Sequence, residues 1–162
     1  MEYFLLLHIM WKKPHNWMIA MAALLTIVLL GLELCHAANP ETGMHYAVRF
    51  KDRLIYIVFI ILSFIISDVA LLSAKKPFYQ VFLSIVNAIV LLGFQIWILL
   101  DFFTTKLQTG LRMSSVYTLS IGAVFPAIAV ILLAVAVKFA ADEGTAQRIA
   151  AAFEKSGGAA KN

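Results

Sequence analysis

The sequence predicts an all-α integral membrane protein, a bundle of four transmembrane helices with short loops and a short C-terminal helical tail. Of its 162 residues, 62% are hydrophobic and 14% are charged, whereas soluble domains are about half apolar and about a quarter charged. The mean hydropathy is +0.90. The apolar residues form blocks of about twenty, the length that a helix needs to cross the bilayer core. An outer-membrane barrel is excluded, because its strands are shorter and alternate in hydrophobicity.

The chain divides on this basis into an N-terminal interfacial and basic segment (1–16), a four-span transmembrane domain (17–137) and a cytoplasmic tail (138–162). The spans and their loops use most of the chain, so no soluble catalytic domain of ordinary size fits in the remainder. The four expected spans are 17–35, 54–74, 78–100 and 115–137.

The first ten residues leave two interpretations open. They contain the acidic Glu2 and only a short apolar run with no basic residue before it, which matches a signal peptide poorly. Either they form an interfacial segment, or translation starts at Met10. Trp17 follows the basic pair Lys12-Lys13 and is expected to anchor the first span at the interface.

Two prolines make specific predictions about helix geometry. Pro77 follows the basic turn Lys75-Lys76 and suits the first position of the third span, where a missing N–H costs nothing. Pro126 lies inside the fourth expected span. It removes the backbone hydrogen bond to Gly122, so we expect a kink there.

Basic residues are divided unequally between the two sides of the membrane, eight on the side of the termini and the 75–76 turn and five on the other. The positive-inside rule therefore predicts that both termini lie in the cytoplasm. We expect the early members of the first group to contact lipid headgroups, and no nucleic acid to bind. These headgroup candidates are Lys12, Lys13, Lys75 and Lys76; the same side also holds Lys138, Arg148, Lys155 and Lys161, and the other side holds Arg49, Lys51, Arg53, Lys106 and Arg112.

Asp68 is the most informative polar residue within the spans. It lies about 10 Å inside the basic turn, and intramembrane acids are costly and often functional. Lys75 follows seven residues later and leans back toward it, because helical side chains point toward the N-terminus. We expect a structural ion pair with Lys75 or a hydrogen bond to the neighbouring helix; the alternative is proton or ion handling.

Other polar residues within the spans are expected to join helices. A turn centred on residues 75–76 would place Asp68 level with Ser84, and Ser63 level with Asn87, across the interface of the second and third spans. Asn87 lies about 15 Å beyond the turn, where an amide usually bonds across helices. Gln95 shares a face of the third span with Ser84.

Glu33 and His36 have the i, i+3 spacing of a carboxylate–histidine metal pair. A di-metal bundle needs two such pairs and further carboxylates, so we expect no metal site and, instead, a salt bridge from Glu33 to Arg49 or Arg53. The only cysteine, Cys35, rules out an internal disulfide and Cys-x-x-Cys chemistry.

No cofactor or catalytic activity is expected from the remaining residues. Intramembrane haem normally requires histidines within the spans, and the four histidines lie outside them or at their ends. No phosphate-binding glycine loop, nucleophile–base arrangement or pair of acids flanking a cavity is present in the sequence. The four histidines are His8, His15, His36 and His45.

Three stretches support a family resemblance. They are the turn Lys75-Lys76-Pro77, the run from Gln80 to Leu83-Ser-Ile-Val-Asn87, and the run from Pro126 through Leu132-Leu-Ala-Val-Ala-Val-Lys138 to Asp142-Glu143 and Arg148. With them the chain resembles an uncharacterised bacterial family of four-span inner-membrane proteins, catalogued as a domain of unknown function. The resemblance implies a four-helix integral membrane protein and no known activity, cofactor or catalytic residue.

These observations favour a non-catalytic accessory or assembly subunit of a larger inner-membrane complex, held in the bilayer beside other membrane subunits. Stripes of small residues, such as Ser63, Ser67, Ala70 and Ala74, would let helices approach closely. One alternative is a small oligomeric transporter or channel with Asp68 as its ion-coupled acid. Another is a respiratory or photosynthetic subunit that lines a quinone or pigment site.

Overall fold

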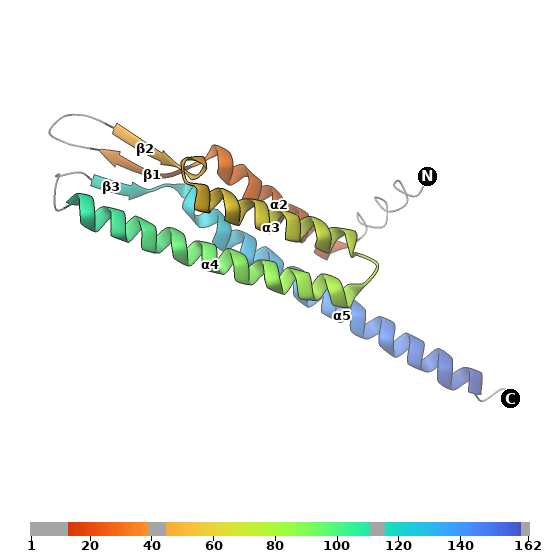
Figure 1. Ribbon diagram of the computed structural model, residues 1–162. Helices are drawn as coiled ribbons and strands as arrows, with labels where there is room; N and C mark the ends of the chain where they lie inside the picture. The colour runs from red at the N-terminus through yellow and green to blue at the C-terminus, as the bar shows by residue number, and fades with distance from the viewer. Residues whose placement is uncertain (1–12, 39–44, 111–115, 160–162) are drawn as a thin grey trace, which may run out of the picture.

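A computed structural model describes residues 13–38, 45–110 and 116–159 of the chain. Four long helices run alongside one another and form a bundle, with a small sheet at one end (Figure 1). Within the described ranges, all four are long and apolar enough to cross a membrane. The chain is therefore a multi-pass membrane protein, and the predicted four-helix fold is confirmed. The helices are α2 (Pro14–Val28), α3 (Leu54–Leu72), α4 (Pro77–Gly110) and α5 (Phe125–Ala159).

Prolines start two of the helices. Pro14 begins α2 and Pro77 begins α4, as predicted for Pro77, because the ring fixes a helical φ and the absent N–H has no partner at that position. The turn between α3 and α4 is closed by Ser73, whose hydroxyl donates to the carbonyl of Val69 at 2.8 Å and whose carbonyl accepts from the N–H of Lys76 at 2.8 Å.

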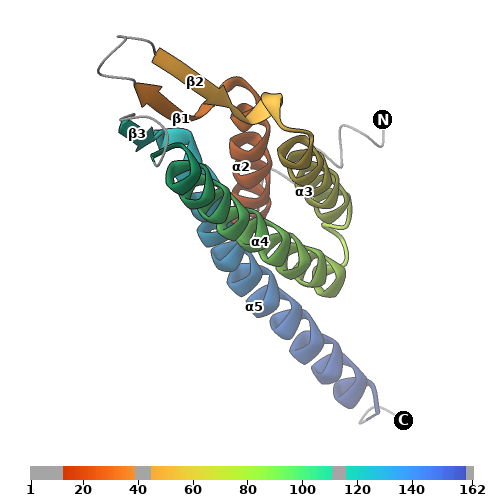
Figure 2. The same ribbon diagram turned by 60° about the vertical axis from the view of Figure 1, so that its left-hand side comes forward.

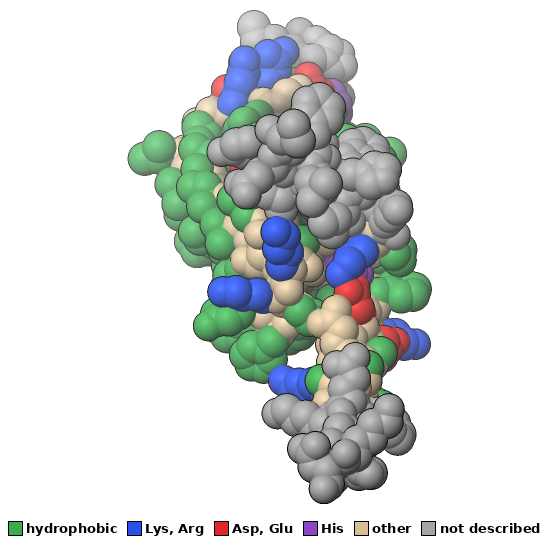
Figure 3. All heavy atoms as spheres, turned by 90° about the vertical axis from the view of Figure 1, so that its right-hand side faces the viewer, with side chains coloured by type: hydrophobic (Ala, Val, Ile, Leu, Met, Phe, Trp, Pro, Cys, Tyr) green, Lys and Arg blue, Asp and Glu red, His purple; other side chains and the backbone are tan. Residues whose placement is uncertain are grey.

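The last two helices are longer than their expected spans. α4 continues to Gly110, through most of the loop expected after residue 100. α5 runs without interruption into the predicted tail as far as Ala159 and projects beyond the other helices (Figures 1 and 2). The end face around this projection gathers charged side chains, whereas the flanks of the bundle are hydrophobic (Figure 3).

A three-stranded antiparallel sheet, which the sequence reasoning missed, lies at the opposite end of the bundle. Strand β1 (Glu33–Ala38) is central, flanked by β2 (His45–Arg49) and β3 (Val116–Leu119). β3 joins it from far along the chain, with Cys35 opposite Leu119. The sheet thus ties the segment after the first helix to the segment before the last.

The sheet shortens two of the expected spans. The first helix ends at Val28, a 3₁₀ turn (η1, Leu29–Gly31) follows, and residues 33–35 are strand rather than helix. The fourth begins at Phe125 after the 3₁₀ turn η3 (Ile121–Val124), not at 115. Strand pairing satisfies backbone groups that a helix would otherwise have to pair internally.

The kink predicted at Pro126 is wrong, because Pro126 lies in the first turn of α5. Its missing N–H there belongs to the groups that a helix start leaves unpaired in any case. Gly122, just before it, is required for close packing. A Cβ at this position would lie 3.1 Å from the carbonyl oxygen of Glu33 and 3.1 Å from Leu32 Cβ.

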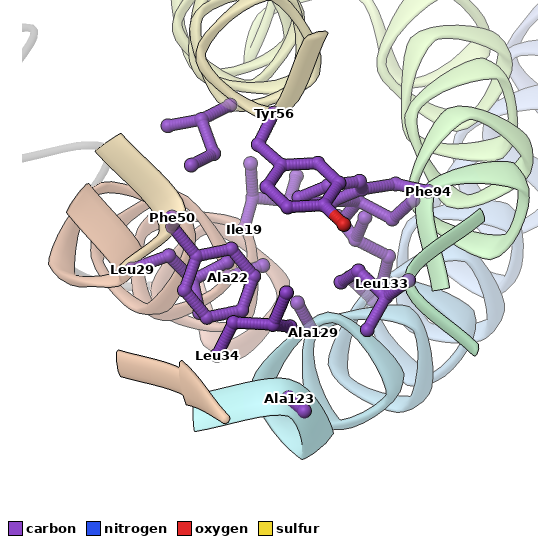
Figure 4. Close-up of a cluster of buried hydrophobic side chains, with 14 of the residues drawn as sticks. Ile19, Ala22, Leu29, Leu34, Phe50, Tyr56, Phe94, Ala123, Ala129 and Leu133 are labelled. Carbon is purple, nitrogen blue, oxygen red and sulfur yellow. The ribbon is translucent and has the colours of Figure 1, made fainter. Parts of the chain in front are cut away.

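Aromatic side chains fill the core at the sheet end of the bundle (Figure 4). Phe50, in the 3₁₀ turn η2 (Phe50–Asp52), is buried together with Tyr56 and Phe94. Their ring centroids are 5.7 to 6.2 Å apart, and Phe59 stacks on Phe94 at 5.1 Å. Edge-to-face and stacked pairs of this kind stabilise a core beyond their burial alone.

Candidate functional site: a buried polar column

One face of α4 is polar over its first three turns and apolar after that. Gln80, Ser84 and Asn87 are at most 1% exposed, and their spacing of four and three residues puts them on the same side of the helix. Leu91 continues the face toward the aromatic core. The bundle interior is therefore polar near the α3–α4 turn and apolar near the sheet.

Side chains from two other helices complete this buried polar column. Asn87 Nδ2 donates to Ser67 Oγ of α3 at 2.7 Å. Gln80 Nε2 donates to Asn16 Oδ1 of α2. We use the term polar column for this set, all at most 2% exposed: His15, Asn16, Ser63, Ser67, Gln80, Ser84 and Asn87.

The column meets an ion pair at the end of the bundle. Glu143 of α5 pairs with Lys13, just before α2, and accepts from Gln147 Nε2 at 3.1 Å. His15 Nε2 lies 3.8 Å from Glu143 Oε2. The side chains of Lys13 and Glu143 are 24% and 27% exposed, so the pair stands between solvent and the column.

Five atoms of the column have no hydrogen-bond partner within the described parts of the chain. Buried polar groups are normally paired with protein or with ordered water. Serine hydroxyls in a helix can turn to a carbonyl four residues earlier, and the side chain of His15 lies within hydrogen-bond reach of Gln80. The amide oxygen of Asn87 still needs a donor from elsewhere. The column can thus accept small polar donors. The five atoms are His15 Nε2, Ser63 Oγ, Gln80 Oε1, Ser84 Oγ and Asn87 Oδ1.

A second polar cluster lies at the sheet end of the same two helices. Arg53 Nη1 contacts Asp101 Oδ1 at 2.9 Å, and the Tyr56 hydroxyl donates to Asp101 Oδ2. Arg53 immediately precedes α3, Tyr56 lies in the first turn of α3, and Asp101 belongs to α4. Together with the Asn87–Ser67 bond, this cluster fixes α3 against α4 at two heights.

Cys35 is buried in β1, outside the membrane-spanning helices. Burial raises the pKa of its thiol, an effect that nearby Arg53 opposes and Asp101 reinforces. Since the thiolate is the reactive form, this cysteine is a poor nucleophile and a poor metal ligand.

Asp68 does not lie where the hairpin register predicted. It is exposed on the outer face of α3, and its neighbour Ser67 takes the inner position instead. The predicted pairing of Ser63 with Asn87 is also wrong, because Asn87 bonds to Ser67, one helical turn away. Among the described residues no ion pair joins Asp68 to Lys75. α3 ends at Leu72 and not at residue 74, so the turn is longer than expected and the register of the two helices is shifted.

The other polar residues predicted from the sequence differ in where they lie in the structure. Ser84 and Asn87 are buried between helices, whereas Gln95 is only partly buried and its Oε1 has no partner in the described chain. Lys75 and Lys76 are exposed at the turn, and Lys76 Nζ lies 5.6 Å from the ring centroid of Tyr79. Of the other headgroup candidates, Lys13 pairs with Glu143 and Lys12 lies outside the described residues.

Glu33 and His36 do meet, with 2.9 Å between Glu33 Oε2 and His36 Nε2. In a regular strand residues three apart face opposite sides, but a register shift between Glu33 and Cys35 brings them to the same side. The predicted salt bridge from Glu33 to Arg49 or Arg53 is wrong: within the described chain Glu33 pairs with His36, and Arg53 pairs with Asp101. No group of three or more possible metal ligands occurs in the described ranges.

Sequence reasoning did not assign His15, Asn16 and Gln80 to the column. The polar spacing at Gln80, Ser84 and Asn87 is visible in the sequence and would have indicated an inward face. The contact of Lys13 and His15 with Glu143 joins residues about 130 positions apart, and no local pattern predicts it.

No protein-family model, curated protein or solved structure matches this chain. The resemblance to the four-span family therefore stays a prediction.

Proposed function

We propose that this protein is a non-catalytic subunit that assembles with another membrane protein in the bacterial inner membrane, and that it docks through the face of α3 carrying Asp68. One observation carries the proposal: the only charged residue of α3 is exposed on the outside of the bundle. Its neighbours on that face, Ile65 and Leu72, are 52% and 74% exposed.

The depth of Asp68 makes exposure to lipid unfavourable. It lies four residues from the end of α3, about 6 Å along the helix axis. A charged residue at the centre of a membrane helix costs roughly 2.5–3.5 kcal/mol on insertion scales. Asp68 lies nearer the helix end, so its cost is below that figure, but its side chain is too short to reach far toward the interface. A basic or hydrogen-bond-donating side chain on a partner helix would remove much of this cost. The partner is thus a transmembrane helix with such a donor at matching depth.

The distribution of basic residues supports the orientation. Lys13, the 75–76 turn and Arg148 lie toward one end of the bundle, and the β2–η2 segment with Arg49 and Lys51 lies toward the other. The first group, being larger in the sequence, faces the cytoplasm under the positive-inside rule. Both termini are then cytoplasmic.

The proposal is tested by purifying tagged protein from its native membrane with Asp68→Asn, Asp68→Leu or the control Asp142→Asn, which alters an exposed acid of α5. A photo-reactive residue at Ile65 in each variant would capture what faces α3. We expect one membrane protein to be captured by the wild type, the Asn variant and the control, and to be lost with Asp68→Leu. Equal capture with Asp68→Leu, or capture of lipid alone, would overturn the proposal, as would capture of a second copy of this chain.

A second function is favoured by the polar column, whose unpartnered buried atoms suit a path for protons or small cations. The acid in this case is Glu143 at the mouth of the column, since Asp68 lies outside it. Proton flux into liposomes that depends on Glu143 and Asn87, but not on Asp68, would support it. The remaining hypothesis, a quinone or pigment site, stays untested.

A further inference from the structure

A groove of about 390 Å³ lies between the start of α4 and the projecting part of α5. Pro77, Phe78 and Val81 form its wall on α4. Ala140, Ala141 and Gly144 form the floor on α5. It is separate from the polar column, whose side chains point into the bundle. The space-filling view shows a hollow between the projecting end of α5 and the body of the bundle (Figure 3).

Small residues on α5 create the groove. Opposite Pro77, α5 presents Gly144, where even an added Cβ would lie 3.5 Å from the proline ring. Ala140 and Ala141 one turn earlier leave space that larger side chains would fill. Phe78 and Tyr79, 67% and 57% exposed, border this region on α4 at the depth where aromatic residues gather near lipid headgroups.

The groove is apolar at its inner end and basic at its outer end. Beyond Gly144 its walls are Thr145, Gln147, Arg148 and Ala151. Arg148 is exposed, and no ion pair to it occurs among the described residues. Lys75 and Lys76, both exposed, immediately precede Pro77 at the rim. An anionic group attached to an apolar chain would match both ends.

We propose that this groove binds one acyl chain of an anionic phospholipid, with its phosphate held by Arg148 and the turn lysines. Basic pockets between helices at the cytoplasmic surface have the chemistry for such headgroups. The site is independent of the Asp68 face on α3.

The test compares phosphatidylglycerol with phosphatidylcholine of the same acyl chains, added to the full-length protein in detergent and counted as retained lipid by native mass spectrometry. We expect wild type to retain phosphatidylglycerol preferentially, by about fivefold, the factor for one basic residue near an anionic surface. Arg148→Gln should lose this preference yet still retain lipid. Ala141→Trp should fill the groove and retain neither lipid.

Ala146→Trp is the matched control, because Ala146 is an exposed alanine of the same helix that does not line the groove. It should behave as wild type. A photo-reactive acyl chain should label Phe78 or Val81 in wild type and in this control, but not in Ala141→Trp, provided that all variants keep the same helicity. Equal lipid retention by Ala141→Trp and Ala146→Trp would overturn the proposal. Displacement of the lipid by a copurifying helix, or labelling confined to other faces, would overturn it too.

Discussion

Asn87 of α4 donates a hydrogen bond to Ser67 of α3 at 2.7 Å, about 15 Å beyond the proline that starts α4. The bond therefore lies near the middle of the membrane, far from bulk water. Interhelical bonds of this kind contribute roughly 0.6–2 kcal/mol. It sets the register of the α3–α4 hairpin, because a shift of one residue would turn Ser67 away from α4.

We predict that Asn87→Leu destabilises the bundle by about 1–2 kcal/mol, since it removes this bond and leaves Ser67 without its partner. Ser67→Ala should cost less, because a small apolar residue still packs at that position. The double variant should cost less than the sum of the two, which a double-mutant cycle of unfolding in mixed micelles would measure. Thr145→Ala is the control, because its hydroxyl bonds only within α5, to Ala141. If the changes in the free energy of unfolding of the two single variants simply add up in the double variant, the direct bond is contradicted.

The four apolar helices could be predicted from the sequence, because a run of about twenty apolar residues is enough to identify a membrane-spanning helix. The start of α4 at Pro77 followed from the same local chemistry. The sheet could not be predicted in this way, because β1 and β3 pair across about 80 residues. The segment around Cys35 is also compatible with the end of a helix. Hydropathy shows which segments are apolar, but not where long-range pairing replaces a helix.

The polar residues illustrate the same limit. Asn87 and Ser84 were expected between helices and are buried there. Asp68 lies on the outer face of α3 and not on the predicted inner face. Adjacent residues on a helix differ by about 100° in direction, so a difference of one residue in the turn moves a side chain from one face to another. The sequence spacing fixes which residues share a face; only packing fixes which face is inside.

We predict that Asp101 makes the strongest polar contact between α3 and α4. It accepts from both Arg53 and Tyr56, and bonds to a charged group contribute about 1.5–3 kcal/mol. Asp101→Ala should therefore lower the free energy of unfolding by more than Tyr56→Phe, which leaves the Arg53 contact in place. Hydrogen exchange of the amides at the start of α3 should rise in Asp101→Ala. A change no larger than that of Asp142→Ala, which alters an exposed acid of α5, would contradict this role.

Cys35 should be slow to react with alkylating reagents in the folded protein. Burial raises the pKa of its thiol, so at pH 8 the folded state holds less thiolate than the unfolded state does. The same shift predicts that the unfolded state ionises first as pH rises, so Cys35 lowers stability above its ordinary pKa and not below it. Cys35→Ala should remove this loss at high pH. The rate of iodoacetamide labelling, folded against denatured, measures the first effect; equal rates in the two states would refute it.

The orientation can be tested with single cysteines at exposed, described positions in a Cys35→Ala background. Lys76 lies at the α3–α4 turn, and Lys51 lies in η2 at the opposite end of the bundle. With both termini cytoplasmic, a membrane-impermeant thiol reagent added to intact cells should label Lys51→Cys and leave Lys76→Cys unmodified until the membrane is opened. The physical reason is the larger number of basic residues on the side of Lys76, which resists translocation.

The sheet, with β2 and the Arg53–Asp101 pair, would then face the periplasm, and the Lys13–Glu143 pair at the mouth of the polar column would face the cytoplasm. Labelling of Lys76→Cys in intact cells, with Lys51→Cys protected, would reverse both assignments and place the proposed lipid groove in the outer leaflet.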